Sequence, residues 1–385
     1  MKQIKDKIGR IKSELITTED ISISTNFDVG KLDSLSRLSI LLVLAGYKQE
    51  EDITVFGKDL SYYININRFG SLNLNFKKAA PKEFDMNIKF KPGEPEKKRI
   101  YSGEGKKTIV LTSGGIDSVA GMLYCEEKGI DYVPFWLRFG QRNQRGEKES
   151  VYGVAQKLGI SPLRCDVNLE EYVKKGWSAW KLGIIPARNF MIASLAGLYI
   201  NNLKENEIDV FLCASKDEIV ESHNDTSPEF YREASKLMSG FYNKKISICT
   251  PFKDVNKADI IKYWSKKWEG ESGVAISDTM TCFLGEHCGT CSSCYYRRIN
   301  GLVAGVDDVD FKEDPLHDKG GLIKEYYLKS FDNWSDTRRI DFLIALDEGR
   351  DIIPKYASTF LSENYPKYEK LIEERKKQLE AIEIK

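Results

Sequence analysis

Short apolar runs alternate with amphipathic stretches between residue 107 and about residue 255. The apolar runs are rich in β-branched and aromatic residues and predict buried strands: Thr108–Leu111, Tyr132–Leu137, Leu163–Asp166 and Val210–Cys213. The stretches between them have apolar residues at helical spacing and predict helices: Val119–Glu127, Lys148–Lys157 and Phe190–Asn202. This alternation is typical of an α/β fold with an open parallel sheet, which binds ligands at the carboxyl ends of its strands.

The first hundred residues have a different pattern. They predict a helix at Leu32–Leu44 that ends at Gly46, a residue suited to a left-handed cap. A meander of short strands is then predicted at Asp52–Phe56, Leu60–Ile66 and Ser71–Phe76. The proline- and lysine-rich segment 91–107 is expected to be a linker. Residues 1–100 are therefore predicted to form a small, separate α+β module.

The chain becomes mainly helical after the region of alternating strands and helices. Helices are predicted at Ala258–Trp268 and from about Trp334 to the end, and the Lys- and Glu-rich segment Tyr368–Lys385 is interpreted as a solvated helix. We therefore expect a nucleotide-binding domain at 101–305 and a helical C-terminal extension at 306–385.

Composition and charge narrow the class of protein. The 385 residues are 41% hydrophobic and 30% charged, which is typical of a globular protein. The 58 basic and 58 acidic residues balance, so no overall field attracts nucleic acid or an anionic membrane. The first residues are basic and amphipathic, without the apolar run of a signal peptide. We expect a cytoplasmic protein that has neither a membrane nor a nucleic acid as a partner and holds phosphate ligands by local groups.

A glycine-rich loop follows the first predicted strand of the sheet. It reads Ser113-Gly114-Gly115-Ile116-Asp117-Ser118 and leads directly into a helix. The glycines bring backbone N–H groups close to an anion, the helix adds its positive end, and Ser113 and Ser118 offer hydroxyl donors. Asp117 would repel a phosphate unless Mg²⁺ lies between them. The alternative is an ordinary strand-to-helix turn in which Asp117 stabilises the first helical turn.

Half of the eight cysteines lie in one short polar loop. The others stand alone in apolar runs, whereas the loop holds the four at Cys282, Cys288, Cys291 and Cys294. Four thiolates complete a tetrahedral Zn²⁺ site, leave no position for water and predict a structural metal. Reduced cysteines that pack as small apolar residues are the alternative, and His287 could replace one thiolate.

The loop at 113–118 resembles the SGGxDS signature of PP-loop ATP pyrophosphatases, which have the adenine nucleotide α-hydrolase-like fold. Together with the cysteine loop, the whole region from residue 107 to 305 resembles the QueC, or 7-cyano-7-deazaguanine synthase, family. The further segments that carry this resemblance occur in the family's order: Gly140-Gln141-Arg142 with Glu147, Ile185-Pro186-Ala187-Arg188-Asn189, Thr250-Pro251-Phe252 to Lys257, and Cys294-Tyr295-Tyr296-Arg297.

The resemblance implies roles for particular residues. The loop Ser113, Gly114, Gly115, Ile116, Asp117 and Ser118 would bind ATP, and the four cysteines would bind Zn²⁺. Arg142, Arg188 and Asn189 would lie at the substrate, while Asp117, Arg188 and Lys257 would act in catalysis. Two alternatives stay open. Arg142 and Arg188 could be surface ion-pair partners, and Lys257 could be only a first-turn helix residue after an Asn256 cap.

The implied activity is that of an ATP-dependent carbon–nitrogen ligase of deazaguanine and queuosine biosynthesis. A carboxylate of 7-carboxy-7-deazaguanine attacks the α-phosphorus of ATP, pyrophosphate leaves with Mg²⁺, and an amine displaces AMP. The compact family uses ammonia and makes a nitrile. A PP-loop enzyme that modifies tRNA and a non-catalytic nucleotide-binding scaffold are the rival functions.

The sequence departs from the compact family in its flanking regions and in one internal segment. The family's Tyr-Pro-Asp-Cys segment is replaced by Asn224-Asp225-Thr226-Ser227-Pro228-Glu229-Phe230, and only five residues separate Cys282 from Cys288. Longer QueC-like proteins with added terminal regions resemble this chain and occur in bacterial antiphage operons. The added regions favour a large partner, the altered segment favours a pocket open to a peptide amine, and an α-amino group is partly neutral at cytosolic pH. We therefore expect transfer of the acyl group to the N-terminus of a partner protein, with nitrile synthesis as the alternative. Whether the chain is a homodimer is left open.

Overall fold

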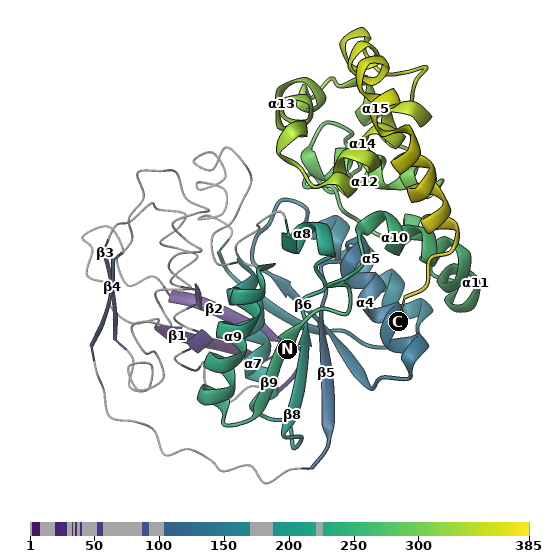
Figure 1. Cartoon of the computed structure of the whole chain (residues 1–385). Helices are drawn as coiled ribbons and strands as arrows, with labels where there is room; N and C mark the ends of the chain where they lie inside the picture. The colour runs from purple at the N-terminus through teal and green to yellow at the C-terminus, as the bar shows by residue number, and fades with distance from the viewer. Residues whose placement is uncertain are drawn as a thin grey trace.

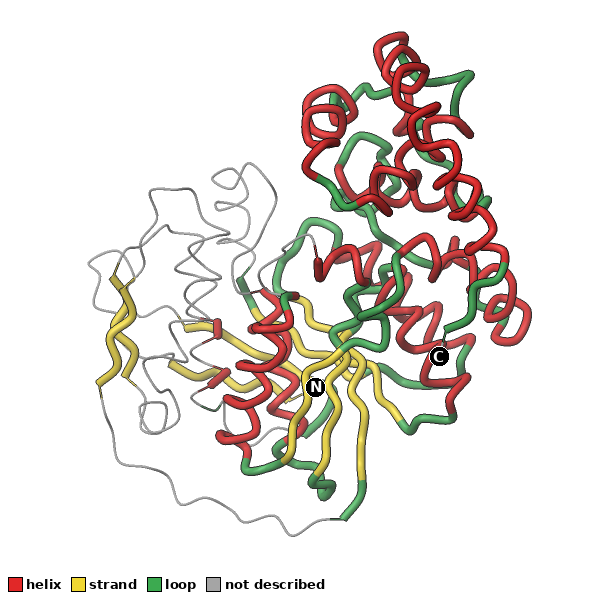
Figure 2. Tube along the Cα trace, viewed as in Figure 1, coloured by secondary structure: helices red, strands yellow, loops and turns green. Residues whose placement is uncertain are grey.

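The computed structural model describes residues 104–169, 188–220 and 226–384, with short pieces of the first hundred residues at 2–7, 20–28, 33, 35–36, 39–40, 52–56 and 87–91. Within these residues the chain forms a central sheet with helices on both faces, and the C-terminal helices form a further group beside it (Figure 1). Figure 2 shows the strands of the sheet at the centre of the described chain, with helices on either side.

The central sheet has seven strands in the order β1-β2-β7-β6-β5-β8-β9. Five are parallel to one another, namely β5 (Lys106–Leu111), β6 (Tyr132–Arg138), β7 (Leu163–Val167), β8 (Glu207–Phe211) and β9 (Lys245–Cys249). The strands β1 (Lys2–Lys7) and β2 (Asp20–Thr25) pair antiparallel with each other, and β2 pairs antiparallel with β7. The predicted open α/β sheet of PP-loop type is confirmed.

The side chains of β5 show how the sheet divides the core. Ile109 and Leu111 pack in one apolar cluster with α7 (Arg188–Ile200) and α9 (Pro228–Tyr242). Val110 points to the other face, where it packs in a second cluster with α4 (Ile116–Lys128) and α10 (Lys257–Tyr263). Because successive strand residues face opposite sides, a strand covered on both faces is apolar throughout.

The helices that follow the strands agree with the predicted ones in type and nearly in extent. The helix α5 (Gln144–Lys157) begins four residues earlier than predicted, and α4 and α7 shift by a few residues. The strand β8 begins and ends earlier than predicted, at Phe211 instead of Cys213. Neither α9 nor β9 was predicted, although α9 has a proline in its first turn after the Ser227 cap and β9 alternates apolar and polar residues.

The first hundred residues do not lie wholly apart from the sheet. Besides β1 and β2, the side chains of Ile23, Leu35 and Ile40 are buried in the cluster with α7 and α9, and the Tyr242 hydroxyl donates to the Asp33 carboxylate at 2.8 Å. The predicted strand Asp52–Phe56 is present as β3, but it pairs in parallel with β4 (Asn87–Lys91) and not within a meander. The predicted strands at 60–66 and 71–76, and most of the helix at 32–44 and of the linker at 91–107, lie outside the described residues.

The C-terminal region is a helical group with its own apolar core. Its main helices are α12 (Ser292–Ala304), α14 (Asp336–Glu348) and α15 (Lys355–Glu380). In the C-terminal group the shorter elements are the 3₁₀ turns Pro315–His317 and Phe331–Asn333, the π-helix Ile323–Tyr327 and α13 (Leu328–Ser330). The short elements nearer the sheet are α8 (Lys216–Val220), the π-helix Trp264–Trp268 that continues α10, α11 (Glu269–Ser272) and the 3₁₀ turn Ile276–Asp278.

The last helix is not the solvated helix that its composition suggested. Ile372 and Leu379 are buried in the C-terminal core, and Ile384 reaches the cluster with α4 and α10. Arg375 is also buried, with 6% of its surface exposed. The sequence pattern failed because a stripe of widely spaced apolar residues is easily hidden among many lysines and glutamates. Among the described helices, none is long and apolar enough to cross a membrane.

Candidate functional site

The glycine-rich loop joins the carboxyl end of β5 to the N-terminus of α4. Gly114 has φ +74°, and a Cβ atom there would lie 2.8 Å from the Ser150 side chain. Its carbonyl accepts hydrogen bonds from the Ser150 hydroxyl and the Met280 N–H, both at 2.8 Å. Gly115 then enters α4 in an extended conformation. The loop therefore requires glycine at position 114 and is held from outside by two other segments.

The two loop serines have different surroundings. Ser113 is exposed, whereas Ser118 is buried and its hydroxyl donates to the Gly115 carbonyl at 3.0 Å. The same hydroxyl oxygen accepts from the Ser113 N–H at 3.3 Å. In this structure Ser118 orders the loop, and Ser113 is the hydroxyl that faces solvent. That both serines donate to phosphate oxygens stays a prediction.

Lys257 connects the glycine-rich loop to α8. It is the first residue of α10, as the Asn256 cap predicted, but its buried ammonium group also reaches the loop. Nζ lies 2.7 Å from Oδ2 of Asp117 and 2.8 Å from Oε1 of Glu218, and it lies over the Tyr296 ring at 4.7 Å. The structure therefore brings together two residues, Asp117 and Lys257, that are 140 positions apart in the printed sequence.

Three carboxylates, those of Asp117, Asp217 and Glu218, lie near the single positive charge of Lys257. Asp217 accepts from the Lys257 N–H at 3.3 Å, beside Glu218. Burial and the charge of Glu218 raise the pKa of Asp117 to about 7, against the opposing effect of Lys257. Burial likewise raises the pKa of Asp217. Oδ1 of Asp117 is buried and has no hydrogen-bond partner among the described residues. An oxygen ligand without a partner, in a site with excess negative charge, fits a hard cation such as Mg²⁺.

Sequence reasoning missed Asp217 and Glu218. They lie on α8, which begins five residues after β8 ends. The rule that ligands bind at the carboxyl ends of parallel strands was a sufficient signal, because the polar segment after Phe211 stands at the same edge as the glycine-rich loop.

The predicted substrate residues follow β6 and open α7. Arg142 is exposed in the turn after β6, and Arg188 is exposed as the first residue of α7. Asn189 is buried beside it. Burial raises the pKa of Glu147, and hydrogen bonds from Gln141 and Trp136 and the charge of Arg188 oppose this. The segment 185–187 and residues 224–225 lie outside the described residues, so the substrate roles stay predictions.

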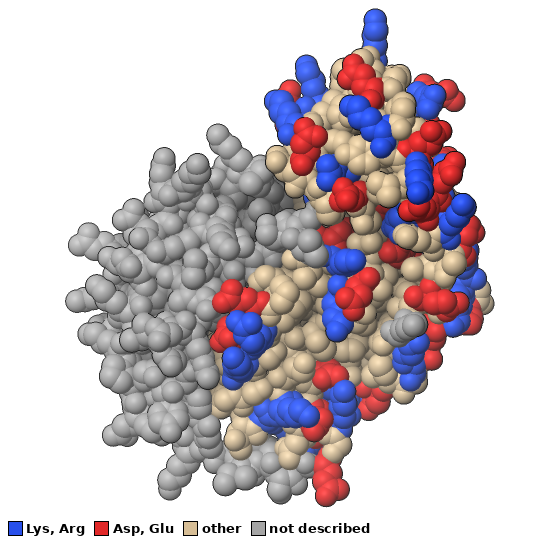
Figure 3. Space-filling view, viewed as in Figure 1, with Lys and Arg blue, Asp and Glu red and all other residues tan. Residues whose placement is uncertain are grey.

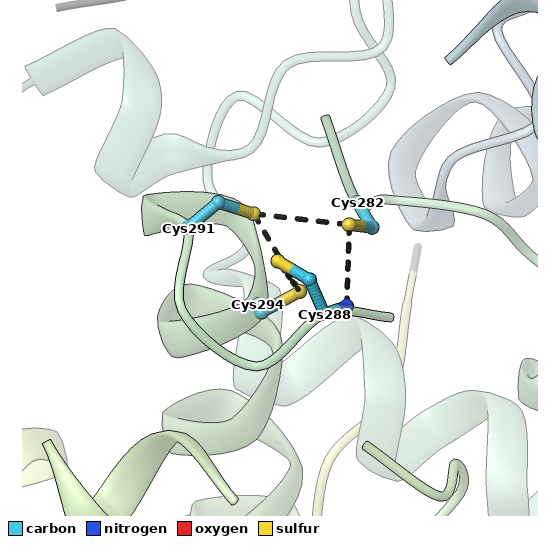
Figure 4. A group of neighbouring side chains, drawn as sticks. All are labelled: Cys282, Cys288, Cys291 and Cys294. Atoms are coloured by element: carbon cyan, nitrogen blue, oxygen red, sulfur yellow. Dashed lines mark hydrogen bonds between the residues drawn. The ribbon is translucent and has the colours of Figure 1, made fainter. Parts of the chain in front are cut away.

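The four clustered cysteines converge as predicted (Figure 4). Their Sγ atoms all lie within 4.8 Å of one another, with separations of 3.9 Å for Cys282–Cys291, 3.9 Å for Cys288–Cys294 and 3.5 Å for Cys291–Cys294. A tetrahedral zinc with Zn–S bonds of ~2.3 Å needs sulfurs ~3.8 Å apart. The cluster therefore has the dimensions of a closed zinc site.

Hydrogen bonds prepare the cysteine loop to hold thiolates. The N–H groups of Leu284 and Cys288 donate to Sγ of Cys282, and the N–H of Thr290 donates to Sγ of Cys288. Contacts among the thiols lower the pKa of Cys282, to which the Cys288 N–H also contributes, and raise the pKa of Cys291 and of Cys294. His287 does not join the cluster. Its ring packs against Phe311, so the proposed replacement of a thiolate by His287 is wrong.

The cysteine loop is joined to the glycine-rich loop through buried polar contacts. Arg297, on α12 three residues after Cys294, donates to the carbonyl oxygens of Thr279 and Ile276 at 3.0 and 2.8 Å and pairs with Asp308. Met280, the residue after Thr279, donates its N–H to the carbonyl oxygen of Gly114. Order in the cysteine loop is therefore transmitted to the backbone that forms the glycine-rich loop.

Substitution of Gly289 by alanine is expected to disrupt the cysteine loop. This glycine has φ +77°, and an added Cβ would lie 1.6 Å from the Glu313 carbonyl oxygen. The left-handed conformation costs about 1 to 2 kcal/mol, and the overlap adds about 1 to 3 kcal/mol. Gly321→Ala is the matched control, because Gly321 has φ +69° with no atom within 4 Å. Denaturant unfolding should show the larger loss for Gly289→Ala. Equal losses would mean that the Glu313 contact does not constrain the loop.

Charge on the surface is mixed. Figure 3 shows lysine and arginine interspersed with aspartate and glutamate over the described part of the face drawn. Several are close pairs, such as Lys245 with Glu207 and Lys106 with Asp209. This distribution agrees with the balanced overall charge.

Comparison with known proteins adds an independent line of evidence. The family model "Queuosine biosynthesis protein QueC" matches residues 107–304. The chain is similar to the 7-cyano-7-deazaguanine synthase of Methanothrix thermoacetophila, at 26% identity over 52% of this chain and 96% of that protein. The synthase of Acetivibrio thermocellus is 28% identical over 54% of this chain and 99% of its own length. That of Methanocaldococcus jannaschii is 27% identical over 52% and 97%. The segments before residue 107 and after residue 304 lie outside the matched family region.

Proposed function

This chain belongs to the QueC family, and on that premise we propose that it is an ATP-dependent enzyme that adenylates 7-carboxy-7-deazaguanine. The observation that carries the proposal is the contact of Lys257 with Asp117 at the start of α4, 2.7 Å apart. It places a cation and a carboxylate at a glycine-rich loop of the kind that binds phosphates. The relatives it resembles are synthases of 7-cyano-7-deazaguanine by name.

Each group at the loop has a role in the proposed reaction. Backbone N–H groups at the start of α4 bind the β- and γ-phosphate oxygens, and Ser113 adds a hydroxyl donor. Lys257 balances the carboxylates of Asp117 and Glu218 and so keeps a polyphosphate from being repelled. Asp117, through the oxygen that lacks a partner, would hold Mg²⁺. That ion would neutralise charge on the leaving pyrophosphate.

In the proposed reaction, adenylation of the carboxylate replaces its oxide, a poor leaving group, by AMP, a good one. A carboxylate oxygen of the substrate bonds to the α-phosphorus of ATP while the bond from that phosphorus to the bridging oxygen breaks, which releases pyrophosphate. The amine then bonds to the acyl carbon and loses a proton, and the bond to AMP breaks. Arg188 and Asn189 at the start of α7, with Arg142, are proposed to orient the deazaguanine carboxylate.

We propose that Zn²⁺ fills the four-cysteine site and has a structural role. Four thiolates leave no position for a water or a substrate. The contacts from Arg297 to Thr279 and from Met280 to Gly114 provide the means by which the metal supports the glycine-rich loop.

The proposed acceptor of the acyl group is the N-terminal amine of a partner protein in antiphage defence. Ammonia needs no docking surface, yet this chain has regions on both sides of the matched segment 107–304. An α-amino group has a pKa of about 7.7 to 8.0, so a useful fraction is neutral near pH 7, unlike a lysine near about 10.4. The alternative is synthesis of 7-cyano-7-deazaguanine from ammonia, which is the function named for the relatives.

A PP-loop enzyme that modifies tRNA is the weaker alternative. The charge of the chain is balanced, and the face in Figure 3 mixes both signs over its described residues, whereas tRNA binding favours a basic patch. A non-catalytic scaffold is opposed by the contact between Asp117 and Lys257, which a protein without phosphate chemistry does not need.

The proposal is tested by incubation of the purified chain with ATP, Mg²⁺ and 7-carboxy-7-deazaguanine. We expect AMP and pyrophosphate by chromatography, in amounts that depend on the deazaguanine. ADP as the main product would overturn the assignment of α,β-cleavage. Intact-mass measurement of candidate partners encoded nearby then separates the acceptors: a partner heavier by one acyl group supports protein modification, and free 7-cyano-7-deazaguanine supports the alternative.

A further inference from the structure

The C-terminal helix carries a buried arginine that joins three helices. Arg375 on α15 donates from Nε to Asp341 of α14 at 2.8 Å and from Nη1 to Asp259 of α10 at 2.6 Å. The side chains of Arg375 and Asp259 are each 7% exposed. Burial raises the pKa of Asp341 to about 6, against the hydrogen bond from Arg375. The arginine therefore lies between two carboxylates in the interior, where such charges need close partners.

Asp259 uses its second oxygen to cap the helix that presents Lys257. Oδ2 accepts from the Asn256 N–H at 3.2 Å and from Asn256 Nδ2 at 3.3 Å. The next residue is Lys257, whose ammonium group lies 2.7 Å from Asp117. A continuous line of contacts thus runs from Arg375 through Asp259 and the start of α10 to the glycine-rich loop.

Other contacts hold α15 along the same helices. Glu380 pairs with Lys262 of α10 at 2.8 Å and with Lys266 at 3.1 Å. Beyond the helix, Lys128 at the end of α4 donates to the carbonyl of Ile384 at 3.3 Å. Figure 1 shows α15 descending past α10 toward the C-terminus. The extension therefore contacts α4 and α10, the two helices whose first turns carry Asp117 and Lys257.

We propose that Arg375 is a positioning residue for the phosphate site, which it serves by fixing Asp259 and with it the first turn of α10. The expected effect of Arg375 on the reaction rate rests on the proposed function, whereas its expected effect on the start of α10 does not. Stability alone does not account for the ion pairs, because a buried ionic cluster is often no more stable than apolar residues of similar volume. Arg375 also lies beyond residue 304, where the match to the QueC family model ends.

The test compares two variants that both remove the ion pair between α14 and α15. Arg375→Met removes the contacts to Asp341 and Asp259, whereas Asp341→Asn leaves the pair of Arg375 with Asp259. Lys376→Ala, at an exposed pair with Glu348, is the surface control. At a temperature where all are folded, we expect Arg375→Met to lower the rate of AMP formation about tenfold, since small displacements of a catalytic group are costly. The other two should stay within twofold of the wild type.

Amide hydrogen exchange provides a readout that does not require the proposed reaction. Exchange in the first turn of α10 should quicken about tenfold in Arg375→Met and remain unchanged in Asp341→Asn. Asp259→Asn should resemble Arg375→Met, and the double variant should lose little more than either single one, because both act along one line of contacts.

The outcomes separate the two proposals. If the wild type forms no AMP, the proposed function fails, and the exchange measurement still decides the role of Arg375. Equal exchange in Arg375→Met and Asp341→Asn would overturn the positioning role, and so would equal rates of AMP formation where the wild type is active. Should Arg375→Met not fold, Arg375→Lys takes its place, because lysine keeps the charge but lacks the planar fork that donates from Nε to Asp341 and from Nη1 to Asp259. An about threefold loss of rate is then expected, and wild-type values of rate and exchange would contradict the proposal.

Discussion

Substitution of Asp117 by alanine is expected to lower the rate of AMP and pyrophosphate formation by about 100-fold or more, the usual scale for loss of a positioned charge in a transition state. The substitution removes the carboxylate proposed to hold Mg²⁺ and leaves Lys257 paired only with Glu218. Initial rates at saturating ATP measure the effect. Asp131→Asn is the matched control, because that carboxylate is 73% exposed and pairs with Lys107 away from the loop.

The pH dependence of the wild type tests the same carboxylate. The pKa of Asp117 is raised to about 7, so the ionised form is present above that pH and is lost as the pH falls through it. Since a metal ligand must be deprotonated, the concentration of Mg²⁺ needed for half-maximal rate should rise as the pH falls below about 7. The small remaining activity of Asp117→Ala should lack this dependence. An alanine variant with wild-type rates would remove Asp117 from the proposed mechanism.

Removal of the proposed zinc is expected to have the largest effect on stability. We expect one Zn²⁺ per chain by metal analysis and, for Cys291→Ser, a loss of about 3 kcal/mol or more in the free energy of unfolding, because metal binding contributes directly to folding. Cys291 is the N-cap residue of α12, a position that serine favours, so the substitution removes a metal ligand without weakening the start of the helix.

The control for the zinc prediction is another single cysteine. Cys249→Ser changes a half-buried thiol on β9, far along the sequence from the cluster, and should cost less than about 1 kcal/mol. Both variants are compared by thermal unfolding and by zinc content. Native protein without zinc, or equal melting temperatures for the two variants, would contradict a structural zinc site.

Local sequence pattern determined the central part of the fold and the two motifs. The strands β5, β6 and β7 were predicted nearly in full because strands covered on both faces form apolar runs. The glycine-rich loop and the cysteine loop were equally visible, since each requires particular residues at close spacing. In both motifs the residues that carry the chemistry lie close together in the sequence.

Contacts between distant segments were decided only by the tertiary structure. From the sequence, Lys257 could be either a first-turn helix residue or a ligand of the phosphate site. Packing of α10 against α4 is what brings its ammonium group to Asp117. The same holds for Glu218, and for Arg375, which stands among lysines and glutamates that resemble a solvated helix. A long charged side chain can be buried where another element supplies an oppositely charged partner. Periodicity along the chain reports the apolar face of one helix, but it contains no information on which distant carboxylate that helix will meet.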